Sequence, residues 1–369
     1  MSAPVPRRAP RARRPVRAVA WIVGAGAGLV VASVLLESVL LRPHPIPPVV
    51  SLRLLAHMLS GGALFSNPCA GAALGPAGCS GATFIVLYIT LPEVLLALIV
   101  GAALGMSGGA LQGVFRNPLA DPFLLGISSG GTLGAAIVYV YRVGEAQADL
   151  YLPAFAFLGS VATGMLIFGI SRGRSSSIET VLLSGVAVAN LLSAILSLVL
   201  LYNPFGAEQL TFWLFGGLAL ASWTVDGIAF GAVLILGTLL ALFGRELNLL
   251  QLGPEVAQSS GVDALRVRVT VILLASLTTA VAVAFTGIIG FVGLVSPHIV
   301  RRLAGSDYRI VLPGSAAVGA LLLLGANDAS VLAFPTSYLP LGIFTAFAGV
   351  PFFLILLQRQ RRSAGMGSA

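Results

Sequence analysis

The chain has 369 residues, of which 57% are hydrophobic and 9% are charged, and its mean hydropathy is +0.99. Several uninterrupted apolar runs are each long enough, at about 18 residues or more, to cross a hydrocarbon core of roughly 30 Å. This composition excludes an ordinary soluble domain and predicts an all-α polytopic membrane protein. A transmembrane β-barrel is excluded as well, because the runs do not alternate between apolar and polar residues.

The apolar runs predict ten transmembrane helices in one membrane domain over residues 19–357. The predicted spans are residues 19–41, 83–113, 123–142, 150–171, 178–202, 223–244, 265–285, 288–302, 310–327 and 339–357. A basic tail (1–18) precedes them, and a second tail (358–369) follows them. The two notable connections are an extracytoplasmic loop over 42–82 and a cytoplasmic loop over 245–264.

Arginine indicates the orientation of these spans. All 21 basic residues are arginine and none is lysine, which gives a formal net charge of +8. Of these, 18 fall on the side of the membrane that holds both termini, and the other side holds Arg42, Arg53 and Arg142. Because positive charge accumulates on the cytoplasmic side, both termini are predicted to be cytoplasmic in the inner membrane. The basic excess is therefore a signal of topology rather than of nucleic-acid binding.

The first apolar run begins at Trp21 and is too long for a cleaved signal peptide, and no clear small-x-small cleavage site follows it, so a retained first span is expected. Cys69 and Cys79 lie in the extracytoplasmic loop, where an oxidising environment permits a disulfide. Either they form that bridge or they remain two unpaired small residues. Neither alternative indicates chemistry.

A polar turn connects the second and third spans at "FRNPLADPFLLGISSG" (115–130). Its polar and proline residues are Arg116, Asn117, Pro118, Asp121 and Pro122. Asn117 precedes a proline and is expected to be extended or in a turn. Asp121 followed by Pro122 is typical of an N-cap and a first helical residue. Glycines at four-residue spacing on both sides of the turn predict close helix packing.

Small polar side chains lie on single faces of two spans. Asn190, Ser193 and Ser197 share one face of the fifth span, and Thr345 lies between two glycines of the last span. Such groups either bond a neighbouring helix or face a watered pathway. Asp328, near the outer end of the ninth span, is either a functional intramembrane acid or a helix cap.

The sequence indicates no catalysis and no cofactor in this chain. Its three histidines are scattered, no metal-ligand spacing occurs, and no nucleophile motif is present. A phosphate-binding P-loop requires a lysine, and the chain has none. If ATP drives this protein, a partner subunit must bind the ATP and its magnesium.

Four sequence blocks resemble the permeases of iron-chelate and cobalamin ABC importers, known as the FecCD family. The first is "GAALGMSGGALQGVFRNPLADPFLLGISSGGTLGA" (101–135), and the second is "TFWLFGGLALASW" (211–223). The third is "LNLLQLGPEVAQSSGVD" (247–263). The fourth comprises "FTGIIGFVGLVSPHIVRRLAGSDYRIVLPGSAAVGALLLL" (285–324) with "LPLGIFTAFAGVPFFLILL" (339–357). The order of these motifs matches the family from about residue 85 to 357.

The resemblance implies the type II ABC importer permease fold with ten spans. It implies that two permease subunits, identical or different, enclose a pathway above two ATPase subunits, and that an extracytoplasmic binding protein delivers the substrate. The fifth and last spans would line this pathway, with Asn190, Ser193, Ser197 and Thr345 facing it. The residues that would form the coupling helix against the ATPase are Gly253, Pro254, Glu255, Val256, Ala257, Gln258, Ser259, Ser260 and Gly261. The residues agree with this role, because Gly-Pro breaks the chain and Gly261 closes a short helix.

The chain departs from the family where the binding protein docks. Family members usually carry R-L-P-R at the outer start of the second span, where this chain has "TLPE" ending at Glu93. Leu332 and Tyr338 replace a further arginine and glutamate of the family pattern. Either the binding protein presents basic groups to Glu93, or a partner permease supplies the arginines, or docking uses other surfaces. The plain alternative is that Glu93 pairs locally.

The sequence therefore predicts the permease subunit of an ATP-driven importer for an iron chelate, with a ferric siderophore as the first candidate and haem or cobalamin as the others. It does not identify the chelate or distinguish a homodimer from a heterodimer. The alternative function is an ATP-independent secondary transporter. That class uses coupling-ion carboxylates at mid-membrane, whereas the acids here cluster in loops and near span ends.

Overall fold

The computed structural model describes residues 28–40, 46–65, 67–71, 75–144, 148–170, 178–204, 206–334 and 340–365. The regular secondary structure of these residues is entirely helical. The predicted basic tail (1–18) and the tail residues 366–369 lie outside the described residues, as do Arg42, Arg172, Arg174 and Tyr338.

An N-terminal helix, Gly28–Leu40, precedes the labelled elements. The others are α2 (Pro48–Leu59), α3 (Gly75–Phe84), η1 (Ile85–Thr90), α4 (Leu91–Phe115), η2 (Pro122–Leu125), α5 (Ile127–Tyr141), α6 (Ala148–Ile170), α7 (Ile178–Tyr202), α8 (Ala207–Leu214), α9 (Trp223–Leu242), α10 (Gly244–Gln251), α11 (Pro254–Ser259), α12 (Ala264–Thr286), α13 (Val292–Ala304), α14 (Tyr308–Ala333) and α15 (Leu341–Gly365).

A helix lies at the position of each of the ten predicted spans. Six helices of the described residues are long and apolar enough to cross a membrane. They are Gly78–Phe115, Leu150–Ile170, Thr180–Tyr202, Trp223–Leu242, Ala264–Thr286 and Tyr308–Ala333. The helices at the first, third and last predicted spans are apolar but shorter in the described part of the chain. The prediction of an all-α polytopic membrane protein is confirmed.

The structure corrects the predicted boundaries in three places. The loop over 42–82 contains α2 and the start of α3, so the second span begins within a much longer helix. The eighth predicted span, 288–302, contains non-helical residues followed by the 13-residue α13. At 1.5 Å per residue α13 is about 20 Å long, which is shorter than a hydrocarbon core. The last helix continues past residue 357 to Gly365.

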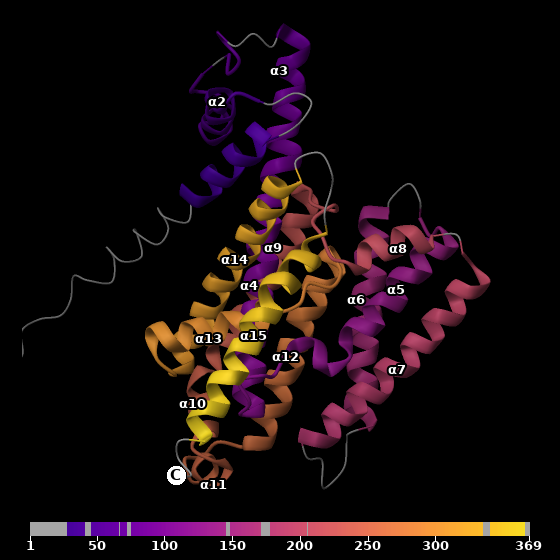
Figure 1. Cartoon of the computed structure of the whole chain (residues 1–369), viewed down its shortest axis with the longest axis vertical. Helices are drawn as coiled ribbons and strands as arrows, with labels where there is room; N and C mark the ends of the chain where they lie inside the picture. The colour runs from indigo at the N-terminus through magenta and orange to yellow at the C-terminus, as the bar shows by residue number, and fades with distance from the viewer. Residues whose placement is uncertain are drawn as a thin grey trace, which may run out of the picture.

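The helices form two groups (Figure 1). In the first group α4 packs most extensively on α14, and α12 and α13 also contact α4. In the second group α5, α6, α7 and α8 pack together, and α12 joins the two groups through α5 and α6. The helices α2 and α3 extend from one end of the molecule, here named the α3 end, and α11 lies at the opposite end, here named the α11 end.

Glycine allows α4 and α14 to approach until their backbones touch. A Cβ atom on Gly101 would lie 2.3 Å from the carbonyl oxygen of Gly319, and one on Gly105 would lie 2.1 Å from that of Ser315. Gly134 of α5 is equally close to the backbone of Phe155 in α6. The prediction that the glycine rows pack helices tightly within one subunit is therefore confirmed, and α4 and α14 form one rigid unit.

A π-helical segment, η1, joins α3 to α4 without a break in the helix. In its register the amide of Leu91 donates to the carbonyl of Val86, five residues earlier. The next carbonyl, that of Leu87, would pair with residue 92, but Pro92 has no N–H. The indole Nε1 of Trp223 donates to this carbonyl instead, at 2.9 Å, and so ties the start of α9 to η1.

Candidate functional site

The polar turn after α4 is a compact, capped connection. Arg116 ends α4 in the left-handed region with φ of 50°. The side-chain Oδ1 of Asn117 accepts a hydrogen bond from the amide of Leu119 at 2.9 Å. Asp121 is the N-cap of η2, since its Oδ1 accepts from the amide of Phe123 at 2.8 Å, and Pro122 is the first residue of that helix. Burial raises the pKa of Asp121 to about 6.

The predicted coupling residues form a short helix with a break on each side. Gly253 and Gly261 both have positive φ, 117° and 79°, and they bound α11. Ala257 is fully buried, and its carbonyl accepts from the amide of Val262 at 2.9 Å. The side chains of Glu255, Val256, Gln258, Ser259 and Ser260 are exposed. Ala257 thus anchors α11, and the five exposed side chains form a surface that is accessible to a partner.

The adjoining helix α10 fixes this surface to the first helix group. Its Leu247 and Leu250 are fully buried. Asn248 bonds the start of α14 twice: its Nδ2 donates to Oδ1 of Asp307 at 2.6 Å, and its Oδ1 accepts from the amide of Tyr308 at 2.9 Å. Gln251 reaches α4, where its Nε2 donates to the carbonyl of Gly113 at 2.8 Å.

Asp307 also accepts from the amide of Arg309 at 3.0 Å. The hydrogen bond from Asn248 is the main reason that the pKa of this carboxyl lies below its usual range. The carboxylate therefore remains charged and keeps Asn248 in place at neutral pH.

A buried glutamine connects α13 to the same unit. Gln112 of α4 donates from Nε2 to the carbonyls of Gly293 and Leu294 at 3.4 and 3.3 Å. Arg301 of α13 donates to Oε1 of Gln112, and it also bonds the hydroxyl of Tyr308. The helices α4, α10, α13 and α14 are thus joined by polar side chains at the α11 end.

Toward the α3 end, acidic side chains meet between the N-terminal helix, α4 and α14. Glu37 is 4% exposed and accepts from Nδ2 of Asn327 at 2.7 Å. Oδ2 of Asp328 accepts from the hydroxyl of Ser33 at 2.9 Å. Glu93 is half-buried and interacts electrostatically with Glu37. The structure therefore places Glu93 half-buried within reach of the carboxylate of Glu37 rather than on an open surface.

The predicted pathway residues lie on separate helices that the single chain does not bring together. Asn190, Ser193 and Ser197 are exposed on α7, which packs on α5 and α6. Thr345 is buried on α15, which packs on α13 and α14, and its hydroxyl donates to the carbonyl of Gly342 at 3.1 Å. In Figure 1 the two helices run along different parts of the molecule.

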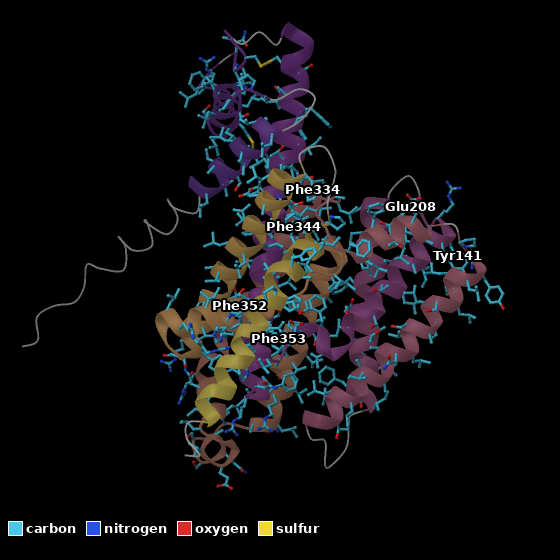
Figure 2. All side chains as sticks on the ribbon, in the orientation of Figure 1. Tyr141, Glu208, Phe334, Phe344, Phe352 and Phe353 are labelled. Carbon is cyan, nitrogen blue, oxygen red and sulfur yellow. A yellow bond between two sulfur atoms is a disulfide. The ribbon has the colours of Figure 1, made fainter. Side chains whose placement is uncertain are left out.

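Two cavities border α15. The larger, of about 640 Å³, lies between α15, the end of α8 and the segment before α13, and is lined by aromatic and aliphatic residues that include Phe215, Phe291 and Phe347. The smaller, of about 250 Å³, is lined by Thr345, Phe352 and residues of α13 and α14. Figure 2 shows Phe334 and Phe344, whose ring centroids lie 6.5 Å apart, and Phe352 further along α15.

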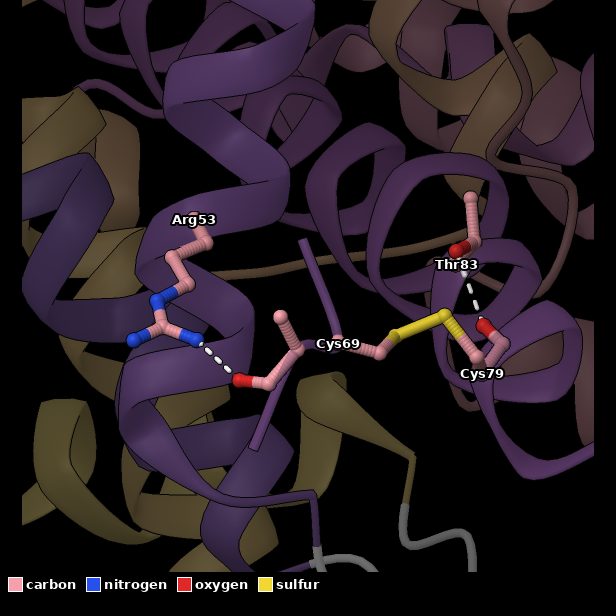
Figure 3. Close-up of a disulfide and its surroundings, with 5 residues drawn as sticks. Arg53, Cys69, Cys79 and Thr83 are labelled. Carbon is pink, nitrogen blue, oxygen red and sulfur yellow. Dashed lines mark hydrogen bonds between the residues drawn. A yellow bond between two sulfur atoms is a disulfide. The ribbon is translucent and has the colours of Figure 1, made fainter. Parts of the chain in front are cut away.

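A disulfide joins Cys69 to Cys79, with Cα atoms 5.9 Å apart (Figure 3). Beside it the guanidinium of Arg53 donates to the carbonyl of Ala70, and the hydroxyl of Thr83 donates to the carbonyl of Cys79 at 2.8 Å. The bridge therefore ties α3 to the segment that follows α2. Among the described residues no group of three or more His, Cys, Asp or Glu side chains is arranged to hold a metal ion.

Known proteins are similar to this chain in sequence and in fold. The model of the FecCD transport family matches residues 49–359. The chain is 41% identical to the hemin transport system permease protein of Yersinia pestis over 75% of this chain and 84% of that protein. It is 36% identical to the cobalamin import system permease protein of Halobacterium salinarum over 93% of this chain and 96% of that one. A solved metal-chelate type ABC transporter in an inward-facing conformation matches with a TM-score of 0.74 and 27% identity, over 92% of this chain and 99% of that one.

The fold and these matches define the class of protein as a multi-pass transmembrane permease of the ABC transporter type. The chain belongs to the FecCD transport family. Members of this family are the permease subunits of transport systems and are not themselves enzymes.

The sequence analysis did not predict several residues whose contacts connect the helices of this permease. Asn248 and Gln251 are three residues apart on α10, and that spacing beside two buried leucines was the available signal. Glu37, a lone acid within the first predicted span, was also visible as an intramembrane carboxylate. Nothing local to Gln112 or Arg301 indicates their contact, because 189 residues separate them.

Proposed function

We propose that this chain is the permease subunit of an ATP-driven importer that takes up an iron chelate, with a ferric siderophore as the first candidate. In this proposal two ATPase subunits bind ATP and magnesium, a second permease subunit completes the pathway, and an extracytoplasmic protein delivers the chelate. The complex resides in the cytoplasmic membrane with both termini cytoplasmic, as the distribution of arginine predicts. The chain itself needs no cofactor.

The observation that carries this proposal is the exposed α11 on its rigid support. Leu252, which directly follows α10, and Val256 of α11 are 67% and 41% exposed, although both are apolar. Apolar side chains that are exposed on α11 and next to it are suited to a protein partner. We assign the residues from Gly253 to Gly261 to contact with the ATPase.

The character of the helix faces favours a chelate over a bare metal ion. A bare ion would need several oxygen, nitrogen or sulfur ligands, and the described residues offer no such group. A large organic chelate instead requires room and neutral contacts. The apolar cavity beside α15 and the exposed hydroxyl and amide groups of α7 supply both. We therefore keep Asn190, Ser193, Ser197 and Thr345 as pathway residues, to be joined across a subunit interface.

Hemin and cobalamin are the alternative substrates. They appear in the names of the similar permeases of Yersinia pestis and Halobacterium salinarum. The binding protein would dock at the α3 end. Because Glu93 lies beside Glu37 and is half-buried there, local interaction is the simpler role for its carboxylate, and α2 and α3 provide the larger surface for docking.

The mechanism requires only that ATP and substrate interact differently with two arrangements of the complex. ATP binding would move the ATPase pair and α11 with it. Asn248 and Gln251 would pass this movement to α14 and α4, because they bond both helices directly. No covalent step takes place in this chain.

The test is uptake by the purified complex in liposomes, supplied with ATP inside and with a ferric siderophore, hemin or cobalamin outside. We expect accumulation of one of these chelates only with ATP and the ATPase subunit. Val256→Asp should weaken ATPase binding at least about tenfold, because it places a charge in the apolar contact of α11. Val49→Asp, at a 55% exposed valine of α2, is the matched control and should bind the ATPase normally.

Uptake that proceeds equally without ATP or the ATPase would overturn the proposal and favour a secondary transporter. ATP-driven uptake of hemin or cobalamin in place of the siderophore would correct the substrate alone. Equal ATPase binding by both aspartate variants would remove α11 from the contact.

A further inference from the structure

An apolar groove lies on the outside of the first helix group, between α4, α9 and α14. Its volume is about 420 Å³, and twelve residues line it, among which Thr238 carries a hydroxyl and the others are apolar. Phe230 and Leu234 form its exposed rim, at 56% and 55% exposed. A Cβ on Gly237 would meet only the Sδ of Met106, at 3.3 Å, so this glycine keeps the floor of the groove open.

The groove has the length of one membrane leaflet. Along α9 its lining runs from Phe230 to Ala241, which is about 16 Å at the rise of an α-helix. That is roughly half of a 30 Å hydrocarbon core. The lining residues of α14, Pro313 and Ala316, lie near the start of that helix and beside the end of α9. The groove therefore runs from the middle of the membrane toward the α11 end.

Two arginines lie near the end of the groove. Arg245 is on α10, directly after α9 ends at Leu242, and Arg309 precedes Pro313 of α14 by four residues. The helices α10 and α14 meet here, because a Cβ on Gly244 would lie 3.1 Å from the Cα and 3.2 Å from the Cγ of Arg309. Both arginine side chains are exposed. The apolar groove thus ends near two exposed arginines on contacting helices.

Asp307 interacts electrostatically with Arg309 but does not form an ion pair with it. The carboxylate of Asp307 accepts hydrogen bonds from Asn248 and from the amide of Arg309, and Glu246 is half-buried on α10. Within the part of the chain that the structure describes, no ion pair joins the guanidinium of Arg245 or of Arg309 to a carboxylate. Guanidinium groups bind phosphate with parallel hydrogen bonds, and basic pockets at the end of transmembrane helices recognise anionic lipid headgroups.

We propose that the groove between α4, α9 and α14 binds an anionic phospholipid, with an acyl chain along α9 and the headgroup phosphate on Arg245 and Arg309. Nothing in the transport cycle requires this site, so it is independent of the proposed substrate. The lipid would fill the space between α9 and the rigid α4–α14 unit, and it would bind at the level where α10 joins them.

The test measures phospholipid bound to the purified complex by native mass spectrometry, after delipidation and titration with phosphatidylglycerol or phosphatidylcholine of the same acyl chains. We expect tight retention of one phosphatidylglycerol per chain over phosphatidylcholine. The double variant Arg245→Gln/Arg309→Gln should lower the affinity for phosphatidylglycerol by about 10- to 30-fold, because each arginine near an anionic headgroup adds favourable electrostatic binding energy. Arg302→Gln, at an exposed arginine of α13, is the matched charge control and should retain the lipid.

A second variant tests the groove without touching charge. Gly237→Leu places a side chain where the acyl chain would lie, and it should lower phosphatidylglycerol binding while the two arginines remain. Equal retention of both lipids by the wild type would overturn the proposal. So would unchanged phosphatidylglycerol binding in the double arginine variant, or an equal loss in Arg302→Gln.

Discussion

The side chain of Asp121 satisfies a backbone amide at the start of a helix. Its carboxylate caps η2 through the amide of Phe123, and the chain around it is closed by Pro122 and the turn at Asn117. Burial disfavours the charged form, which is why its pKa rises to about 6. The same residue thus stabilises the turn as an acceptor and destabilises it as a charge.

The first prediction concerns the pH dependence of stability. An unfolded aspartate has a pKa of about 3.9, whereas Asp121 titrates near 6 when folded, so the folded state binds more protons between these values. Stability should therefore fall as the pH rises from 4 through 6, by on the order of 2 kcal/mol from this group. Asp121→Asn keeps the acceptor for Phe123 and cannot titrate, so its thermal unfolding in detergent should depend less on pH.

The control is Asp121→Ala, which also loses the cap and should be about 1 kcal/mol less stable than Asp121→Asn at every pH. Parallel pH profiles for the wild type and Asp121→Asn would show that this carboxyl does not titrate as described.

For single residues, the sequence predicts the features that depend only on adjacent residues of the chain. Asp121 followed by Pro122 indicates a cap, because both groups act on amides within two residues. The surroundings of Glu93 could not be predicted in the same way. Its carboxylate interacts with Glu37, and Glu37 also interacts with Asp328; these residues come from three helices, and only the packing of those helices brings them together.

Among the elements, α10 determines how α11 is connected to the rest of the molecule. Asn248 holds the start of α14, and Gln251 holds the end of α4. The two helices that receive these bonds are themselves in backbone contact at Gly101 and Gly105. In the proposed mechanism these bonds would carry a displacement of α11 to the closely packed pair of α4 and α14.

The second prediction tests this connection with Asn248→Ala/Gln251→Ala. The buried Leu247 and Leu250 still hold α10 in place, so the complex should assemble and hydrolyse ATP. The number of substrate molecules moved per ATP should fall at least about fivefold, because α11 can then move without α14 and α4. Hydrolysis and uptake are measured together in the same liposomes.

Thr211→Ala serves as the control, because that hydroxyl donates to the carbonyl of Ala207 within α8, away from α10 and α11. An unchanged ratio of transport to hydrolysis in the double variant would mean that coupling takes another route.

The elements differ in how far the sequence predicts them. The break at Gly253, the short helix and its end at Gly261 follow from local backbone chemistry. The helix α10 was missed because hydropathy does not separate an amphipathic turn from a loop. The shortness of α13 was missed because residues 288–291 are apolar, although Phe291 has a φ of 67° that no helix adopts.

Over the whole molecule, the two ends carry different features. The disulfide and the helices α2 and α3 lie at one end, and α11 lies at the other. A disulfide persists in an oxidising compartment, and the sequence places most arginine on the opposite side. We therefore keep the proposed orientation, with the α3 end outside the cytoplasm and the α11 end within it, as a prediction.

The third prediction is this topology. Truncated fusions of an enzyme that is active only outside the cytoplasm should be active after Gly144 and inactive after Gly261. Reporters that fluoresce only inside should give the opposite result. In whole cells, Cys69 and Cys79 should react with an impermeant thiol reagent only after reduction. Activity of the outside reporter after Gly261 would reverse the orientation.

The sequence predicted the class and order of helices for the whole molecule, because the apolar runs and the family motifs are each local signals. It did not predict that α3, η1 and α4 form one continuous helix. The loop before them is rich in glycine and proline, and such a composition favours turns. The disulfide at Cys79 and the contact of α2 with η1 fix this continuous helix, and both are tertiary interactions.

The hydrogen bond of the Trp223 indole determines which substitutions the chain can tolerate at two positions. It supplies the hydrogen bond that Pro92 withholds from the carbonyl of Leu87. If residue 92 could donate, the indole would be redundant, and if the indole were absent, the carbonyl would lose this partner. The two positions, 131 residues apart in the chain, are therefore constrained as a pair: tolerance to replacing the tryptophan depends on whether the proline has already been lost.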